Sequence, residues 1–277
     1  MTTVELICFG NELLIGKTIN TNANWLGRRL MMLGATLTRI TSVADTLQDM
    51  SQIVQEALSR EPEIIITTGG MGTTFDDMAL AAIAKAVDKP LVLSDEALEL
   101  IKERLEILKE TRKINLDLTE ERKRMAMIPE GGKVLRNRAG SAPGVLITSG
   151  KTEIFIVPGV PREMEAIFDH EIAKYFDVDP DHQFFEKSII VNHIPESELA
   201  KAITDIRLRY PKIYFKTHPK SSSTGPNRII EVEVHLTCIC SEEDSKKINL
   251  AEKEVIDVIM NMDGANGKTP KIKDHEE

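Results

Sequence analysis

The segment TTGGMGTTFDD, at residues 67–77, joins an apolar run to a helical pattern and combines glycines, threonines and two adjacent aspartates. Glycines let backbone N–H groups approach an anion, and the following helix offers its N-terminus to negative charge. Carboxylates repel a neighbouring phosphate unless a cation lies between them, and Mg²⁺ is commonly held by one or two carboxylates together with phosphate oxygens. The segment therefore predicts a phosphate site with a divalent metal, whose phosphate-binding residues we assign to Gly69, Gly70, Met71, Gly72, Thr73, Thr74 and Asp76.

A purely structural explanation of the same segment stays open. In that explanation Asp76 caps the following helix and Asp77 interacts favourably with its dipole. The segment is not a P-loop, because no Lys-Ser or Lys-Thr pair follows the glycines. It also differs from the dinucleotide-binding fingerprint, which belongs after the first strand. The paired carboxylates favour the phosphate and metal site over the plain turn.

Acidic side chains also follow the two earlier apolar runs. Glu12 lies in GNELLIG after the first run, and Asp45 lies in VADT after the second. Ligands of open parallel sheets bind outside the carboxyl ends of the strands, so these acids should meet Asp77 at one edge. Together with the pair Asp76 and Asp77, these acids form a constellation of carboxylates at one edge of the sheet, where a cation could be held. Taken singly, Glu12 could be a surface acid, and Asp45 could cap a helix beginning near Leu47.

The elements that would position these residues alternate between short apolar runs and longer helical patterns. This order predicts right-handed β-α-β crossovers and a mostly parallel sheet. We therefore expect an α/β domain over residues 1–178, with a three-layer α/β/α arrangement. Its first strands and helices are predicted at residues 4–9 (strand), 20–33 (helix), 35–43 (strand), 47–58 (helix), 64–67 (strand) and 79–86 (helix).

The second half of this domain is predicted to contain two helices, three short strands and a last helix. The first helix covers residues 94–109 with Ser94 as its N-cap, and the second covers residues 120–127. Glycine and proline turns separate the three strands, and the last helix begins near Arg162 in PGVPREMEAIF. Arg162 follows a strand and could pair with a phosphate, although a surface arginine in the first turn of a helix explains it equally well.

A change of composition at DVDPDHQ, residues 177–183, indicates a linker. The chain beyond it predicts a small α+β domain over residues 183–262 with a mostly antiparallel sheet. Its elements are predicted at residues 184–192 (strand), 196–210 (helix), 213–217 (strand), 228–238 (strand) and 242–262 (helix), with a flexible hairpin loop at KSSSTGPN. Residues 263–277 show no apolar periodicity and are predicted to form a flexible tail.

The composition excludes several classes of partner. The net charge of the 277-residue chain is -9 and its aromatic content is 4%, which argue against nucleic acid and anionic membrane as partners. Its three cysteines are too few and too oddly spaced for a disulfide framework, and Cys8 lies in an apolar run where a buried thiol is expected. We see neither a signal peptide nor an apolar stretch of membrane-spanning length. We therefore expect a reduced, cytoplasmic protein.

Several motifs of the first domain, taken in order, resemble the CinA family (competence/damage-inducible protein A). They are GNELLIGKTINTNANWLGRRL, TTGGMGTTFDD, GSAPG and PGVPREMEAIF, within residues 4–176. The N-terminal domain of that family belongs to the molybdopterin-binding superfamily, with the MoaB/MogA and MoeA proteins. IPESELAKAI and RIIEVEVHLTC resemble its small middle domain. Thr73 stands where the family loop commonly has proline, and the resemblance does not reach the C-terminal nicotinamide-nucleotide amidase domain, so we expect no deamidase activity.

The resemblance implies a pyrophosphatase acting on ADP-ribose or a related nucleotide diphosphate. It implies a divalent metal such as Mg²⁺ and leaves potassium open as a second cation. It also implies that Glu12, Asp45 and Asp77 are the catalytic residues, and that Asp45 and Asp77 hold the metal. It also implies a homodimer or another homo-oligomer. The GSAPG motif adds three phosphate- or nucleotide-binding residues, Ser141, Pro143 and Gly144. Two alternatives remain: binding or adenylylation of molybdopterin at the same site, and a non-catalytic nucleotide-binding regulatory module.

Overall fold

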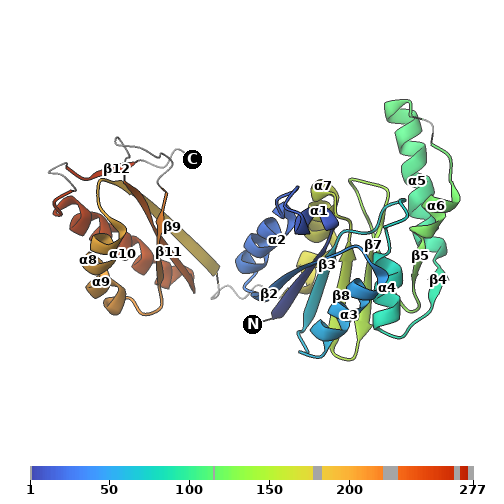
Figure 1. The fold of residues 1–277 in the computed structure, drawn as a ribbon, viewed down its shortest axis with the longest axis horizontal. Helices are drawn as coiled ribbons and strands as arrows, with labels where there is room; N and C mark the ends of the chain where they lie inside the picture. Colours follow the sequence, from blue (N-terminus) through green and yellow to red (C-terminus); the bar gives the residue numbers. More distant parts are fainter. Residues whose placement is uncertain (1, 115, 177–182, 221–229, 265–268, 274–277) are drawn as a thin grey trace. The chain divides into compact units, whose positions relative to one another are not determined.

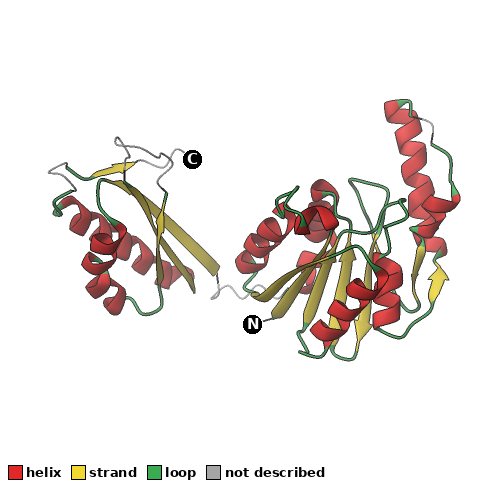
Figure 2. Ribbon diagram, viewed as in Figure 1, coloured by secondary structure: helices red, strands yellow, loops and turns green. Residues whose placement is uncertain are grey.

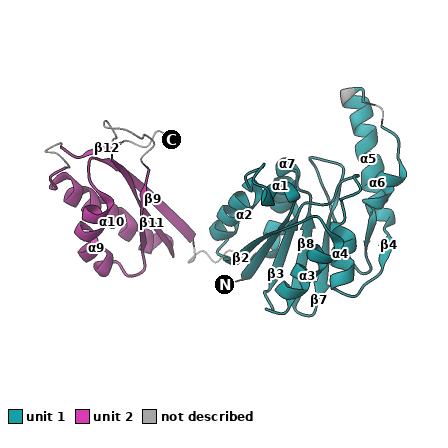
Figure 3. Ribbon diagram, in the orientation of Figure 1, with its two compact units in different colours: residues 1–177 teal, residues 178–277 magenta. Residues whose placement is uncertain are grey.

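The chain forms two compact units, Met1–Asp177 and Val178–Glu277 (Figure 3). The computed structural model describes residues 2–114, 116–176, 183–220, 230–264 and 269–273. No helix within these ranges is long and apolar enough to cross a membrane. The two units are described separately below.

The first unit is built on a six-stranded sheet with the strand order β2-β1-β3-β8-β7-β6 (Figure 1). The strands β2, β1, β3 and β8 are parallel to one another, whereas β7 pairs antiparallel with β8, and β6 pairs antiparallel with β7. The central strands are almost entirely buried because they are covered on both faces. The predicted mostly parallel sheet is confirmed. The strands are β1 (Thr3–Phe9), β2 (Thr36–Val43), β3 (Ile64–Thr68), β6 (Lys133–Leu135), β7 (Gly144–Ser149) and β8 (Thr152–Val157).

Helices cover both faces of this sheet, so the predicted α/β/α layers are confirmed (Figure 2). Successive side chains of a strand point to opposite faces. Accordingly, Ile65 of β3 packs in one core with Val54 and Ile83, and Ile66 packs in a second core with Leu30. The covering helices are α2 (Thr21–Met32), α3 (Leu47–Leu58), α4 (Ala79–Ala86) and α7 (Pro161–Ile167), and α7 continues into a π turn (Phe168–Ile172) and a 3-10 turn (Ala173–Tyr175).

Side-chain caps fix where several of these helices begin. Asn20 caps α2 and Thr46 caps α3, each by accepting a hydrogen bond from a backbone N–H of the first turn. Ser94 caps α5 (Asp95–Arg112), as predicted. Cys8 is buried in the sheet, also as predicted.

Four short elements of the first unit differ from the predictions. The helix predicted to reach residue 127 is α6 (Glu120–Arg124), because residue 127 instead begins β5 (Met127–Pro129). β5 pairs with β4 (Leu91–Leu93), and its buried Ile128 joins the core, which outweighs the local helical pattern. The segment after β1, for which no element was predicted, contains the short helix α1 (Asn11–Leu14).

The second unit is an antiparallel sheet with the strand order β10-β11-β9-β12, together with three helices in its described part. The predicted α+β class is confirmed. Buried and partly buried residues alternate along β11, as expected for a strand with one face on the helices. The elements are β9 (Gln183–Asn192), α8 (Glu196–Ala202), α9 (Thr204–Arg209), β10 (Tyr214–Pro219), β11 (Glu231–Cys240), α10 (Glu242–Met260) and β12 (Lys271–Lys273).

Two predictions for this unit are wrong in part. The helix predicted over residues 196–210 is divided at Ile203, whose φ of -89° and ψ of 1° end α8. The predicted tail contains β12, in which Ile272 pairs with Val191 and packs against the core. A single apolar residue gives no periodicity, so the sequence did not reveal this strand. The predicted linker and the hairpin loop at KSSSTGPN lie outside the described residues, apart from Gln183 and Lys220.

Candidate functional site

A cavity of about 490 Å³ lies at the carboxyl ends of β1, β2, β3 and β8. This is the edge at which the sequence predicts a ligand. Of the predicted site residues, the cavity is lined by Glu12, Asp45, Gly69, Gly70, Met71, Gly72, Thr73, Thr74, Asp76, Asp77 and Ser141. Its other lining residues include Gly10, Leu116, Arg122, Met125, Ala142, Gly159, Val160 and Glu163.

The loop after β3 needs its first two glycines for backbone and steric reasons. Gly69 and Gly70 have φ values of +104° and +63°, which side chains rarely adopt. A Cβ on Gly69 would overlap the carbonyl oxygen of Phe9, and a Cβ on Gly70 would lie 2.9 Å from Cε of Met50. The loop therefore passes directly over the end of β1 and beside α3, and it leaves its backbone bare where it lines the cavity.

Asp77 holds the far end of this loop. Its Oδ2 accepts hydrogen bonds from the backbone N–H of Thr74 at 2.8 Å and from the Thr74 hydroxyl at 2.6 Å. The same hydroxyl also contacts Asp76. The following helix has Met78 as its N-cap residue, without a side-chain cap. The explanation in which Asp76 caps that helix is therefore wrong.

Asp45 is tied to the segment after β1 by a backbone hydrogen bond. Its Oδ2 accepts from the N–H of Asn11 at 2.8 Å. Because Thr46 caps α3, the alternative role of Asp45 as that cap is also wrong. Burial raises the pKa of Asp45, and the charges of Glu12 and of both aspartates of the glycine loop raise it further, against a lowering by the Asn11 hydrogen bond. The carboxylates thus act on one another across the cavity.

Glu12 reaches the cavity from the short helix α1. Its carboxylate lies against Gly10, where a Cβ would come within 2.6 Å of Oε1. Side chains from the ends of three neighbouring strands therefore bring negative charge to one cavity.

Three other residues considered from the sequence do not line this cavity. Ser141 of GSAPG does, but Pro143 and Gly144 of the same motif are absent from its lining. Gly144 begins β7, and a Cβ there would lie 3.2 Å from side-chain atoms of Leu135 and Ile167, so close packing explains the glycine. Arg162 is exposed in the first turn of α7 and is also absent from the lining.

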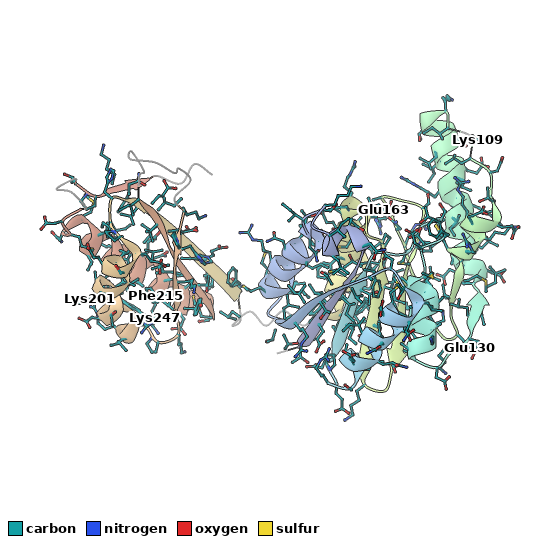
Figure 4. The ribbon with its side chains drawn as sticks, viewed as in Figure 1. Lys109, Glu130, Glu163, Lys201, Phe215 and Lys247 are labelled. Atoms are coloured by element: carbon teal, nitrogen blue, oxygen red, sulfur yellow. The ribbon has the colours of Figure 1, made fainter. Side chains whose placement is uncertain are left out.

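Glu163 is a cavity residue that the sequence predictions missed. It lies in the first turn of α7, the helix that follows β8, and is partly buried (labelled in Figure 4). Burial raises the pKa of its carboxyl, while a hydrogen bond from Asn137 and the charge of Arg104 lower it by less. The rule that selected Asp45, an acid just after a strand end, also selects Glu163.

Asn137 links Glu163 to the GSAPG loop. Its Nδ2 donates to Oε2 of Glu163 at 2.6 Å and to the carbonyl oxygen of Ala142 at 2.8 Å. Its Oδ1 accepts from the N–H groups of Ala139 and Gly140 at 2.9 and 2.8 Å. One amide side chain therefore sets both the shape of the loop and the position of the carboxylate. Its role depends on contacts made 26 residues along the chain, which no local pattern reveals.

The comparison with protein families is decisive for the first unit. A family model described as a probable molybdopterin binding domain matches residues 5–177. The chain belongs to this family. Among solved structures, the chain is similar to the protein CinA from Thermoplasma acidophilum, described as of unknown function, with 34% identity and a TM-score of 0.55. That match covers 61% of this chain and 95% of the other, and it confirms the resemblance to CinA.

The sequence similarity between this molybdopterin-binding-domain protein and its relatives extends over both units. A protein of Metallosphaera sedula is 39% identical over 232 residues, which are 84% of this chain and 84% of that one. A protein of Sulfurisphaera tokodaii is 36% identical over 260 residues, which are 94% of this chain and 96% of that one. The second unit is thus part of what these relatives share.

The fit of a metal to this molybdopterin-binding domain can be tested on its donor set. The described residues contain no cluster of three or more His, Cys, Asp or Glu side chains able to hold a metal ion. The described residues therefore do not supply a complete set of metal ligands by themselves. The arrangement does fit Mg²⁺ held by one or two carboxylates with the remaining oxygens from a phosphate and water. Asp45 and Asp77 are the carboxylates that would take that part.

Proposed function

We propose that the first unit hydrolyses the diphosphate of a small nucleotide, ADP-ribose or a related nucleotide diphosphate. The observation that carries this proposal is the meeting of a glycine loop with the carboxylates of Glu12, Asp45 and Asp77 in one cavity. Burial and, to a smaller extent, the neighbouring acids raise the pKa of Asp45 and so disfavour its charge, which a bound cation would offset. A phosphate alone would be repelled, whereas a phosphate with its cation would be attracted.

In this proposal the loop Gly69–Thr74 binds one phosphate through backbone N–H groups and the threonine hydroxyls. Asp45 and Asp77 hold the cation, and Glu12 adds negative charge beside them. When bound, Mg²⁺ offsets the charge that develops on the phosphate oxygens during attack by water. Asp77 also keeps the loop closed through Thr74, so it positions the phosphate as well as the cation.

A second candidate is the binding or adenylylation of molybdopterin at the same cavity. The observation in its favour is the family match, a probable molybdopterin binding domain over residues 5–177. A phosphorylated pterin could use the same glycine loop, and an adenylylated pterin contains a diphosphate like that of ADP-ribose. The third possibility, a regulatory module that binds a nucleotide without cleaving it, is an outcome of the experiment below.

The test is release of AMP and ribose phosphate from ADP-ribose by the purified full chain, with Mg²⁺ and with a chelator. Asp77→Asn removes the charge at the site, and Asp88→Asn is the matched control, because Asp88 follows the other end of α4. We expect Mg²⁺-dependent turnover that is lost in Asp77→Asn and retained in Asp88→Asn. A folded wild type that turns over no nucleotide diphosphate contradicts the proposal. Molybdopterin binding would then favour the second candidate, and nucleotide binding alone the regulatory module.

A further inference from the structure

Carboxylates lie on both sides of the glycine loop. The strand order β2-β1-β3-β8 places the loop, which follows β3, between two groups of acids. Asp45 and Glu12 follow β2 and β1 on one side, and Glu163 follows β8 on the other. Displacement at a phosphorus atom places the attacking oxygen and the leaving oxygen roughly in line, on opposite sides. A phosphate on the loop, which itself carries Asp77, would therefore have Asp45 and Glu12 on one side and the separate carboxylate of Glu163 on the other.

Two neighbouring residues, Asn137 and Gly140, determine where the carboxyl group of Glu163 lies. Asn137 donates to its Oε2 at 2.6 Å. A Cβ on Gly140 would overlap the carboxyl group of Glu163, so the glycine creates the space that the carboxyl occupies. An acid that only made the helix soluble would need neither the amide donor nor the adjacent glycine.

The surroundings of Glu163 suit proton transfer. Partial burial raises the pKa of the carboxyl, and a carboxylate with a raised pKa is a better base near neutral pH. The charged group that acts on it is Arg104 of α5, which lowers the pKa in part. The Arg104 guanidinium donates to the carbonyl oxygen of Ala139 at 2.8 Å, while its buried Nε makes no hydrogen bond within the described residues. Glu163 also lines the cavity, so its carboxyl borders the space in which the reacting phosphate would lie.

We propose that Glu163 is the base that accepts a proton from the attacking water, an inference that rests on the proposed function. One O–H bond of water breaks and its proton passes to a carboxylate oxygen of Glu163. The water oxygen forms a bond to phosphorus, and the bond from phosphorus to the bridging oxygen breaks, with its electron pair leaving on the second phosphate. Glu163 then releases its proton to solvent or to the departing phosphate. The products are two phosphate monoesters, and no oxidant or reductant is needed.

Glu163→Gln tests this role, because glutamine keeps the size of the side chain and an oxygen acceptor for Asn137. The matched control is Glu165→Gln on the same helix, since Glu165 does not line the cavity. For ADP-ribose hydrolysis we expect kcat to fall by about 10²–10⁴-fold in Glu163→Gln, with KM nearly unchanged. We also expect the acidic limb of the pH profile of kcat/KM to disappear, which loss of a purely structural contact would not cause.

A second variant, Gly140→Ala, leaves Glu163 in the chain and displaces its carboxyl. We expect it to lose kcat as well, with AMP binding retained by calorimetry. Undiminished kcat in Glu163→Gln, or a lower kcat with the acidic limb intact, overturns the assignment of the base while leaving the pyrophosphatase proposal standing. Absence of turnover by the wild type overturns both. The two failures are therefore distinguishable in one set of assays.

Discussion

Asp77 and Thr74 form a closed pair: one carboxylate oxygen accepts both the backbone N–H and the hydroxyl of the threonine, at 2.8 and 2.6 Å. This pair ends the glycine loop before α4 begins at Ala79. Asp77 therefore contributes a charge to the cavity and also fixes the shape of the loop. The two contributions can be separated, because a substitution at Thr74 removes one hydrogen bond and leaves the charge.

Asp77→Asn should abolish turnover of ADP-ribose, whereas Thr74→Ala should lower it by about 10–100-fold, because a lost hydrogen bond to a charged carboxylate is worth about 1.5–3 kcal/mol. Asparagine can still accept from the Thr74 N–H, so the free energy of unfolding should change by about 3 kcal/mol or less in either variant. Turnover kinetics and urea unfolding check both statements. Equal losses of turnover in the two variants would mean that loop shape, and not charge, is the contribution of Asp77.

Asp45 should destabilise the fold at neutral pH. Its pKa is raised in the folded chain, first by burial and then by the neighbouring charges of Glu12, Asp76 and Asp77. A carboxyl with a raised folded pKa contributes stability below its unfolded pKa of about 3.9, and this contribution is lost as the pH rises through the folded pKa. We expect Asp45→Asn to raise Tm at pH 7 and to leave it unchanged near pH 3, measured by thermal unfolding without divalent metal.

Asp244→Asn is a control that should change Tm at pH 7 in the opposite direction to Asp45→Asn. A hydrogen bond from Lys247 lowers the pKa of Asp244, so its stabilising contribution is present at pH 7 and is lost as the pH falls through the folded pKa. Asp244→Asn should therefore lower Tm slightly at pH 7 and lose this effect in acid. A lower Tm for Asp45→Asn at pH 7 would show that the carboxylates do not repel one another in the folded chain.

The features that could be predicted from sequence are those that depend on local pattern. Apolar runs followed by helical periods give the parallel sheet, and acids just after those runs lead to the cavity lined by Glu12, Asp45 and Asp77. The roles of these acids stay predictions. The expectation that acids after strand ends line the ligand site also applies to Glu163 after β8. The sequence analysis instead considered the adjacent Arg162, as a possible phosphate ligand.

The features that could not be predicted depend on partners distant in the chain. β5 forms because Ile128 joins the core and pairs with Val92, and β12 forms because β9 offers it an edge. Gly144 is the last residue of the motif GSAPG, yet its neighbours show that it serves packing between β7 and α7. Asn137 lies in no motif, and its importance comes from the four groups that it holds together. Only three-dimensional contacts distinguish such residues from ordinary loop positions.

Gly69→Ala should be far more costly than Gly150→Ala. Both glycines have positive φ, +104° and +60°, but a Cβ on Gly69 would overlap the carbonyl oxygen of Phe9, whereas a Cβ on Gly150 meets nothing within 4 Å. Gly150→Ala should lose about 1 kcal/mol of unfolding free energy from backbone strain alone. Gly69→Ala should lose about 3 kcal/mol or more, because backbone strain and a backbone clash combine.

Urea unfolding of the two variants measures this difference, and binding of AMP reports on the loop. Gly69→Ala should bind AMP weakly even where it remains folded, since the end of β1 must move. Gly150→Ala should bind AMP like the wild type, because the turn between β7 and β8 does not line the cavity. Equal stability of the two variants would show that the loop after β3 can rearrange without cost, and its glycines would then need another explanation.

Glu5 and Arg60 form an ion pair between a buried carboxylate and a partly exposed guanidinium, and its loss should destabilise the first unit. Both guanidinium contacts are short, Nε to Oε1 at 2.7 Å and Nη2 to Oε2 at 2.6 Å, and the Glu5 side chain is only 5% exposed. Arg60→Ala leaves that carboxylate buried without its partner, which should cost about 3 kcal/mol in urea unfolding at pH 7. Lys102→Ala is the control, because its partner Glu99 is 64% exposed and such surface pairs contribute about 0.5 kcal/mol.

Replacing both members of the Glu5–Arg60 pair, as Glu5→Gln with Arg60→Ala, should recover part of the lost free energy of unfolding, since no charge is then buried. A double variant less stable than Arg60→Ala alone would show that the carboxylate finds water or another donor when the arginine is gone.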